Sequence, residues 1–165
     1  MRAGVLTISD KASKGERVDT SGAAIAELLG TIDASIDRTD VVPDEAPQIS
    51  DTLRSWADSG EIDLIITTGG TGLSPRDVTP EATAEVIERP APGLGELMRS
   101  EGLKHTPMAA LSRGVAGVRG RCLIVNLPGS EKGVRESLMA VIDILPHAVE
   151  ILRGGAGDHT STSNK

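Results

Sequence analysis

Residues 62–72 read Ile-Asp-Leu-Ile-Ile-Thr-Thr-Gly-Gly-Thr-Gly, and this stretch decides the fold. Its first part, residues 62–66, is a short apolar run with several isoleucines, which predicts a buried strand. Three glycines follow within residues 67–72, where they let the backbone approach a ligand closely and adopt positive φ. A buried strand that ends in a glycine-rich turn is typical of a parallel sheet that binds ligands at the carboxyl ends of its strands.

The glycine-rich turn differs from two well-known phosphate-binding motifs. No Lys-Ser or Lys-Thr pair follows Gly72, so the turn is not a P-loop, and the glycine spacing does not match the dinucleotide fingerprint. Successive backbone N–H groups in such a turn can still form a concave anion site. Two interpretations therefore stay open, an anion-binding loop and a tight turn that binds nothing.

Strand and helix patterns alternate on both sides of this stretch. We expect strands at residues 4–8, 32–42 and 122–127, and a strand with a turn at residues 109–118. We expect helices at residues 21–29, 43–56, 94–101 and 131–153, the last of them kinked or divided at Pro146. A further helix begins at Thr79–Pro80, with Thr79 as its N-cap.

This alternation predicts an α/β fold of three layers, in which a mainly parallel sheet carries helices on both faces. The length of 165 residues is enough for one domain, which we place at residues 1–153. Residues 154–165 are rich in Gly, Ser and Thr without an apolar stripe, and we expect a flexible tail there.

Composition excludes several functions. Trp56 is the single aromatic residue, so the chain lacks the stacking platforms that bind single-stranded nucleic acid, and a net charge of -7 disfavours duplex binding. No apolar run reaches membrane-spanning length, and no secretory segment is recognisable. Cys122 lies in an apolar run, which favours a buried thiol, and three scattered histidines predict no zinc site. We therefore expect a cytoplasmic protein without nucleic-acid or membrane partners.

Two aspartates are candidates for catalysis. Asp77 follows the glycine-rich turn, and a carboxylate beside phosphate is unfavourable unless a cation such as Mg²⁺ lies between them. Its structural alternative is a loop aspartate that accepts a turn hydrogen bond. Asp44 follows Pro43 at a helix start, where capping would be a sufficient role. If both face one cleft, they suit phosphoryl or nucleotidyl transfer.

A third strand end carries similar chemistry at residues 126–130, Asn-Leu-Pro-Gly-Ser. Ser130 can cap the following helix, and the N-terminus of that helix can also face an anion. Lys132 in the first turn opposes the helix dipole unless a negative ligand lies nearby. Polar residues of the first loop, among them Ser9 and Asp10, could bind a ligand or only face solvent.

Three segments together resemble one family. They are Thr7–Asp10 with residues 15–16 and 19–22, residues 67–72 with Arg76–Thr83, and residues 126–130, with residues 92–96 and 110–113 between them in the expected order. This set of motifs resembles the MogA/MoaB family of molybdenum cofactor biosynthesis proteins over roughly residues 1–153. Glu131 is a departure, because many relatives have Pro there.

The resemblance implies a homotrimer with a molybdopterin-binding fold that adenylylates molybdopterin with Mg²⁺ and ATP and releases pyrophosphate. It also suggests a MoeA-like molybdenum insertion protein as a partner. It implies catalytic and metal-binding roles for Asp44 and Asp77. The residues expected to bind nucleotide or molybdopterin are Ser9, Asp10, Thr68, Gly69, Gly70, Thr71, Gly72, Ser112, Arg113, Asn126, Pro128, Gly129, Ser130 and Lys132.

Three alternatives to this enzyme stay open. The first is a non-catalytic molybdopterin carrier or scaffold of the same family, which the motifs do not separate from the enzyme. The second is a regulatory or assembly protein in which the glycine-rich turn is only structural. An NAD-linked oxidoreductase is weaker, because the dinucleotide spacing is absent.

Overall fold

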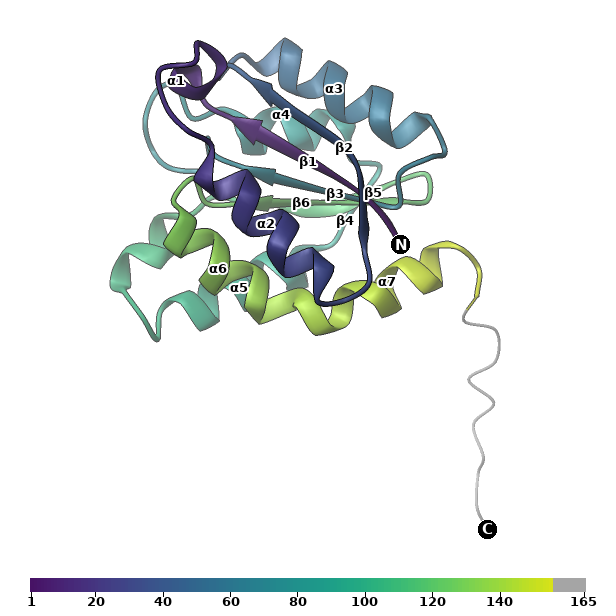
Figure 1. The fold of residues 1–165 in the computed structure, drawn as a ribbon. Helices are drawn as coiled ribbons and strands as arrows, with labels where there is room; N and C mark the ends of the chain where they lie inside the picture. Colours follow the sequence, from purple (N-terminus) through teal and green to yellow (C-terminus); the bar gives the residue numbers. More distant parts are fainter. Residues whose placement is uncertain (156–165) are drawn as a thin grey trace.

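The computed structural model describes residues 1–155 and shows a six-stranded sheet between two layers of helices (Figure 1). The strand order is β2-β1-β3-β6-β5-β4. Four neighbouring strands run parallel, namely β2 (Ser35–Val42), β1 (Arg2–Ile8), β3 (Leu64–Thr68) and β6 (Cys122–Leu127). The antiparallel strands β5 (Ala116–Arg119) and β4 (Arg89–Pro90) complete the sheet. The predicted α/β fold with a mainly parallel sheet is confirmed.

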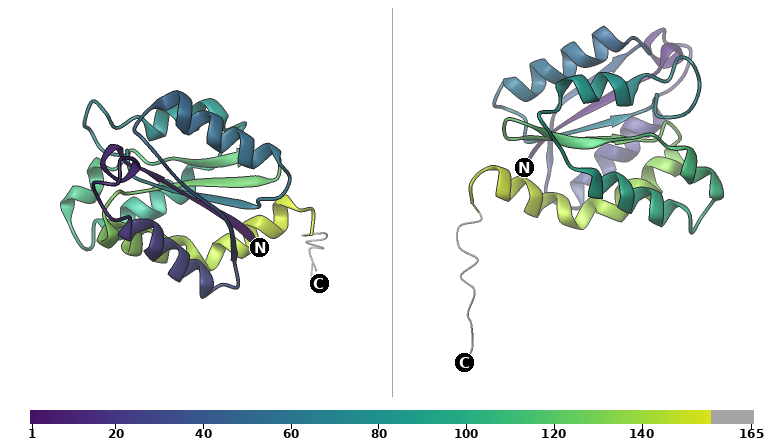
Figure 2. Two further views of the ribbon diagram at one scale, coloured as in Figure 1. Left: turned by 45° about the horizontal axis from the view of Figure 1, so that its top comes forward. Right: turned by 180° about the vertical axis from the view of Figure 1, so that it is seen from behind.

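The helices divide between the two faces of the sheet (Figures 1 and 2). One face carries α3 (Ala46–Asp58) and α4 (Thr79–Val86). The other carries α2 (Thr20–Gly30), α5 (Pro92–Gly102), α6 (Glu131–Val141) and α7 (Leu145–Leu152). Three short helical segments connect these elements: α1 (Asp10–Ser13), η1 (Pro107–Leu111) and η2 (Ile142–Ile144).

Each face of the sheet has its own apolar core, because successive side chains of a strand point to opposite faces. In β3, Leu64 and Ile66 pack toward the core under α2 and α6, whereas Ile65 packs toward the core under α3 and α4. All three are fully buried. The continuous apolar run of residues 64–66 is thus the pattern expected of a strand covered on both faces, and the strand begins at Leu64 rather than at the predicted Ile62.

Trp56, the only aromatic residue, covers a glycine of the first strand. A Cβ placed on Gly4 would lie 2.7 Å from the Trp56 Cε3 atom, so a side chain at this position would displace the indole. Cys122 is also buried in this layer, and burial raises the pKa of its thiol to about 12. The predicted role of Cys122 as a buried core thiol is confirmed.

Several predicted boundaries were wrong. Residues 109–111 belong to η1 rather than to a strand, and the strand of that region is only Ala116–Arg119. By contrast, the predicted division of the helix at residues 131–153 is confirmed, since it consists of α6, η2 and α7. The break precedes Pro146, which lies in the first turn of α7, where its missing N–H costs nothing.

The end of α7 reaches into the predicted tail. Gly154 has a φ of 82°, and its N–H donates to the Ile151 carbonyl at 3.0 Å, while the Gly155 N–H donates to the Glu150 carbonyl at 3.0 Å. This pair of bonds is a Schellman cap, so the ordered helix end includes both glycines. The rest of the predicted tail, residues 156–165, lies outside the described residues. Among residues 1–155, no helix is long and apolar enough to cross a membrane.

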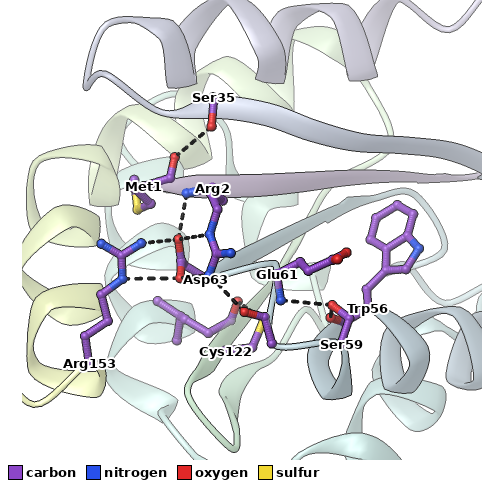
Figure 3. A network of polar contacts seen from close by, with 11 residues as sticks. Met1, Arg2, Ser35, Trp56, Ser59, Glu61, Asp63, Cys122 and Arg153 are labelled. Carbon is purple, nitrogen blue, oxygen red and sulfur yellow. Dashed lines mark hydrogen bonds and ion pairs between the residues drawn. The ribbon is translucent and has the colours of Figure 1, made fainter.

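Asp63 ties both ends of the described chain to the start of β3 (Figure 3). The carboxylate accepts from the Arg2 backbone N–H at 2.7 Å, from Arg2 Nη2 at 3.2 Å and from Arg153 Nε at 3.2 Å. The residue is only 5% exposed. Burial alone would raise the pKa of Asp63, but the hydrogen bonds from Arg2 and Arg153 outweigh burial and lower the pKa to about 2.

We predict that Asp63→Asn lowers the free energy of unfolding at neutral pH by about 2 kcal/mol. The folded pKa lies below the ordinary value, so this stabilisation is complete above about pH 4 and is lost as the pH falls toward 2. Urea unfolding across this pH range should show the difference between wild type and variant shrinking with acid. The exposed Asp143→Asn is the control, and a difference that stays constant down to pH 2 contradicts the prediction.

Candidate functional site

The register of the parallel strands brings the predicted loops to one edge of the sheet. Thr7 of β1 pairs with Thr68 of β3, and Thr68 pairs with Leu127 of β6. The loops that follow β2, β1, β3 and β6 therefore leave the sheet side by side, near α1 in Figure 1. These are the loops in which we expected the site.

The glycine-rich turn after β3 needs glycine at two positions. Gly69 and Gly70 have φ values of 101° and 67°. A Cβ on Gly69 would lie 2.1 Å from the Ile8 carbonyl oxygen, and a Cβ on Gly70 would lie 2.3 Å from Thr79 Oγ1. Backbone therefore occupies the space that a side chain would need at Gly69.

Thr79 holds this turn in place. Its hydroxyl donates to the Gly69 carbonyl at 2.8 Å, and its N–H donates to the Gly70 carbonyl at 3.1 Å. The prediction that Thr79 is the N-cap of α4 was wrong, because Val78 is the N-cap and Thr79 is the first helical residue. The hydroxyl is buried and used by the turn, so it does not cap the helix.

Asn126 joins the last parallel strand to its neighbours. The side chain is buried, and its amide nitrogen donates to Thr67 Oγ1 at 2.9 Å and to Thr83 Oγ1 at 3.0 Å. Its amide oxygen accepts from the Val115 N–H at 3.2 Å. The side chain thus has a structural role that spans β3, β6 and α4, and it reinforces the site from behind.

A hollow of about 440 Å³ opens between the glycine-rich turn, α5, η1 and the N-terminal half of α6. The predicted residues that line it are Gly70, Thr71, Gly72, Asp77, Ser112, Asn126, Pro128, Gly129 and Ser130. The Ser130 hydroxyl accepts from the Gly133 N–H at 3.1 Å, which confirms its capping role. The N-terminus of α6 therefore lies at the wall of the hollow, where its free N–H groups favour an anion.

A second hollow of about 40 Å³ lies on the other side of Gly69 and Gly129. It includes the predicted residues Ser9, Thr68 and Gly69. Their side chains already have partners, since Ser9 Oγ accepts from the Ala12 N–H at 3.1 Å and Thr68 Oγ1 donates to the Pro128 carbonyl at 2.6 Å. A ligand here would meet mainly backbone and the edges of these side chains.

Asp10 and Asp44 form a reciprocal pair between two of the loops. The Asp10 N–H donates to Asp44 Oδ2 at 2.9 Å, and the Asp44 N–H donates to Asp10 Oδ1 at 3.0 Å. Arg76 lies beside them and pairs with Asp10 at 2.9 Å and with Glu45 at 3.0 Å. Asp44 does not cap α3, whose N-cap is Glu45, so the capping interpretation of Asp44 was wrong.

The carboxylates of Asp44 and Asp77 flank the same turn. Asp44 Oδ1 lies 3.2 Å from the position of a Cβ on Gly70, and Asp77 Oδ2 lies 2.8 Å from that of a Cβ on Gly72. Burial raises the pKa of Asp44, and the charges of Asp10 and Asp77 raise it further. Hydrogen bonds from Arg76 lower the pKa of Asp10. Asp77 also accepts from the Ser74 N–H at 3.1 Å, the turn bond considered as its structural alternative.

Two predicted cations do not face the larger hollow. The Arg113 guanidinium donates to the carbonyls of Gly72 and Asp77, each at 2.8 Å, and pairs with Glu81. It therefore supports the turn and Asp77 from outside the hollow. Lys132 is 80% exposed and lies 3.8 Å from Glu136. Glu131, the departure from the family pattern, turns toward Arg135 at 3.2 Å.

Sequence reasoning missed two charged residues that line the larger hollow, Arg99 on α5 and Glu136 on α6. Arg99 Nη1 donates to the Gly114 carbonyl at 2.9 Å. Both residues lie in the middle of amphipathic helices, where charged side chains are usual, so no local signal set them apart. Arg76 belongs to one of the motifs that resemble the family, and its position next to Asp77 could have identified it as part of the site.

The comparisons with known proteins agree with this geometry. A family model described as a probable molybdopterin binding domain matches residues 4–147. The chain belongs to this family. The crystal structure of the molybdopterin biosynthesis enzyme MoaB from Thermus thermophilus is similar, with 59% identity and a TM-score of 0.88 over 93% of this chain and 96% of that one.

Other relatives of this molybdopterin-binding family carry related names. The molybdopterin adenylyltransferase of Helicobacter pylori strain J99 is 46% identical over 153 residues, which cover 92% of this chain and 87% of that protein. The molybdenum cofactor synthesis protein cinnamon of Drosophila melanogaster is 45% identical over 98% of this chain, but the chain spans only 26% of the fly protein. The resemblance to the MogA/MoaB family is confirmed.

The carboxylates around the turn of this molybdopterin-binding domain suit a magnesium ion only if other ligands help to hold it. Among residues 1–155, no group of three or more His, Cys, Asp or Glu side chains could hold a metal by itself. Mg²⁺ needs fewer protein ligands when it binds with a nucleotide, because one or two carboxylates and the substrate phosphates suffice. Asp44 and Asp77 supply two carboxylates, and the repulsion among Asp10, Asp44 and Asp77 would be relieved by a cation.

We predict different outcomes for two glycine-to-alanine changes in this turn. Gly69→Ala should destabilise the fold by more than about 2 kcal/mol, because the Ile8 backbone cannot move away and the φ is unfavourable. Gly72→Ala should leave the melting temperature near wild type but displace the Asp77 carboxylate and weaken Mg²⁺-dependent nucleotide binding. Gly93→Ala, which meets no atom within 4 Å, is the control. Equal destabilisation by both variants in thermal unfolding would contradict this.

Proposed function

We propose that this protein is a molybdopterin adenylyltransferase, which transfers AMP from ATP to the terminal phosphate of molybdopterin and releases pyrophosphate. The observation that carries the proposal is that Asp44 lies beside Gly70 and Asp77 beside Gly72 of one glycine-rich turn, close enough for their charges to interact. The names of the relatives support the substrate class. Mg²⁺, when bound with ATP, would neutralise charge on the α-phosphate and on the leaving pyrophosphate.

The chain's own residues would position the two substrates. A phosphate oxygen of molybdopterin attacks the α-phosphorus of ATP, and the bond from that phosphorus to the pyrophosphate oxygen breaks. The backbone N–H groups of the glycine-rich turn and the N-terminus of α6 hold phosphate oxygens close to Asp77. Arg113 holds the carbonyl at the end of the turn and that of Asp77 itself, so that Asp77 stays in place during the transfer.

The resemblance also supports proposals about the assembly. Residues 97–111 expose four large apolar side chains, Leu97, Leu103, Met108 and Leu111. Such a concentration of exposed apolar residues is typical of a protein interface. We propose that residues 1–153 form a single domain that assembles as a cytoplasmic homotrimer and acts beside a MoeA-like insertion protein.

We predict that Asp77→Asn abolishes pyrophosphate release from ATP in the presence of molybdopterin, while thermal unfolding stays close to wild type. The amide keeps the shape of the carboxylate but removes its charge, so it no longer helps to hold a cation. Exposed Asp143→Asn is the matched control and should keep full activity. Wild-type turnover in Asp77→Asn would exclude the catalytic role. Molybdopterin binding without pyrophosphate release in the wild type would favour the carrier.

We also predict an acid limb in the pH dependence of kcat that belongs to Asp44. Its pKa is raised, so acidification protonates Asp44 at a higher pH than an ordinary aspartate, and activity falls there. Saturating Mg²⁺ favours the ionised form and should move the limb to lower pH. Asp44→Asn should have low activity without this limb. A limb that is unchanged by Mg²⁺ concentration and retained in Asp44→Asn would contradict the assignment.

A further inference from the structure

Glu136 is a carboxylate in the wall of the larger hollow whose oxygens make no hydrogen bond within residues 1–155. Its side chain is only 19% exposed. Two basic nitrogen atoms lie near it, Lys132 Nζ at 3.8 Å and His105 Nδ1 at 3.9 Å, both beyond hydrogen-bond distance and both on largely exposed side chains. The carboxylate oxygens therefore remain available as acceptors for the N–H groups of a ligand in the hollow.

The position of Glu136 along α6 determines which part of a ligand can contact its carboxylate. Glu136 follows the N-cap Ser130 by six positions, which corresponds to about 9 Å along the helix axis. The N-terminus of α6 and the glycine-rich turn form the anion-binding end of the hollow. The wall that α5 and η1 contribute includes the apolar side chains of Met98, Met108 and Leu111. The hollow thus combines an end that favours anions, an apolar wall and a carboxylate that can accept hydrogen bonds from a ligand.

We propose that Glu136 recognises the 2-amino-4-oxo edge of the pterin ring, an inference that rests on the proposed function. This edge carries an amino group at C2 next to an N–H at N3, and two adjacent donors match the two oxygens of one carboxylate. The phosphate lies at the opposite end of molybdopterin. A molecule whose phosphate occupies the glycine-rich turn therefore directs its amino edge along α6 toward Glu136.

The same contact excludes adenine from this end of the hollow. The amino group of adenine stands next to N1, which is an acceptor, so one carboxylate oxygen would face a lone pair instead of a donor. A binding site rejects a competing ligand more strongly when that ligand leaves a polar group of the site unpaired than when the ligand only differs in shape. Glu136 is therefore a specificity-determining residue that separates the pterin substrate from the nucleotide substrate.

The test compares 6-hydroxymethylpterin with 6-hydroxymethyllumazine, in which a carbonyl replaces the 2-amino group. Calorimetry on the full chain should show that the wild type binds the pterin about 10- to 100-fold more tightly. Glu136→Gln should lose most of this preference, because its amide nitrogen can donate to the lumazine carbonyl. In the adenylylation assay the variant should raise the KM for molybdopterin and leave the KM for ATP unchanged.

Glu131→Gln, an exposed glutamate at the start of the same helix, is the matched control and should keep the wild-type preference. An unchanged pterin-to-lumazine ratio in folded Glu136→Gln would overturn the inference and leave only an ion pair with Lys132. A rise in the KM for ATP instead would place the nucleotide here and would also overturn it. A failure of the proposed function alone would give a different result, because the wild type would then still prefer the pterin over the lumazine but would release no pyrophosphate. A wild type that binds neither pteridine would overturn this inference whatever the turnover.

Discussion

The close approach of Gly69 to the Ile8 carbonyl is the constraint on which the site depends. A Cβ at this position would lie 2.1 Å from that oxygen, so the turn after β3 can lie against the end of β1 only without a side chain. Two hydrogen bonds then hold the same residue: the Thr79 hydroxyl donates to the Gly69 carbonyl, and the Gly69 N–H donates to the Leu127 carbonyl. Three elements thus meet at one residue, and the position of each carboxylate in the site follows from this junction.

Three aspartates, Asp10, Asp44 and Asp77, lie around this junction, and the nearby arginines compensate their negative charge only in part. Arg76 compensates Asp10, whose pKa is lowered, but Asp44 is more buried and its pKa is raised. Arg113 donates to carbonyls beside Asp77 and pairs with Glu81 rather than with Asp77 itself. Burial and the charges of Asp10 and Asp77 disfavour the ionised form of Asp44, and the proposed cation would offset this cost at this edge of the sheet.

Much of this arrangement could be predicted from the sequence, because it depends on local signals. The apolar run of residues 62–66, the glycines after it and the residues 126–130 all lie at strand ends, and parallel strands place such ends together. The roles of Thr79, Asn126 and Arg113 could not be predicted, because each depends on partners that are distant in sequence. A hydroxyl before a proline at a helix start favours an N-cap, yet Thr79 instead satisfies the Gly69 carbonyl, since an unpaired buried carbonyl would cost more than an uncapped helix.

The helical wall of the larger hollow was not predicted, for a related reason. The wall comes from α5, η1 and α6, and the residues of that wall, such as Met98, Arg99 and Glu136, are spaced like those of any amphipathic helix. The glycine-rich turn and the N-terminus of α6 suit phosphate groups in general and therefore do not separate one phosphorylated substrate from another. Discrimination must come from groups that meet the rest of the ligand, and these lie on helices whose sequence pattern reports only their packing. The motifs thus predict the proposed phosphate contacts, whereas a residue that would recognise the rest of the ligand becomes visible only in the tertiary structure.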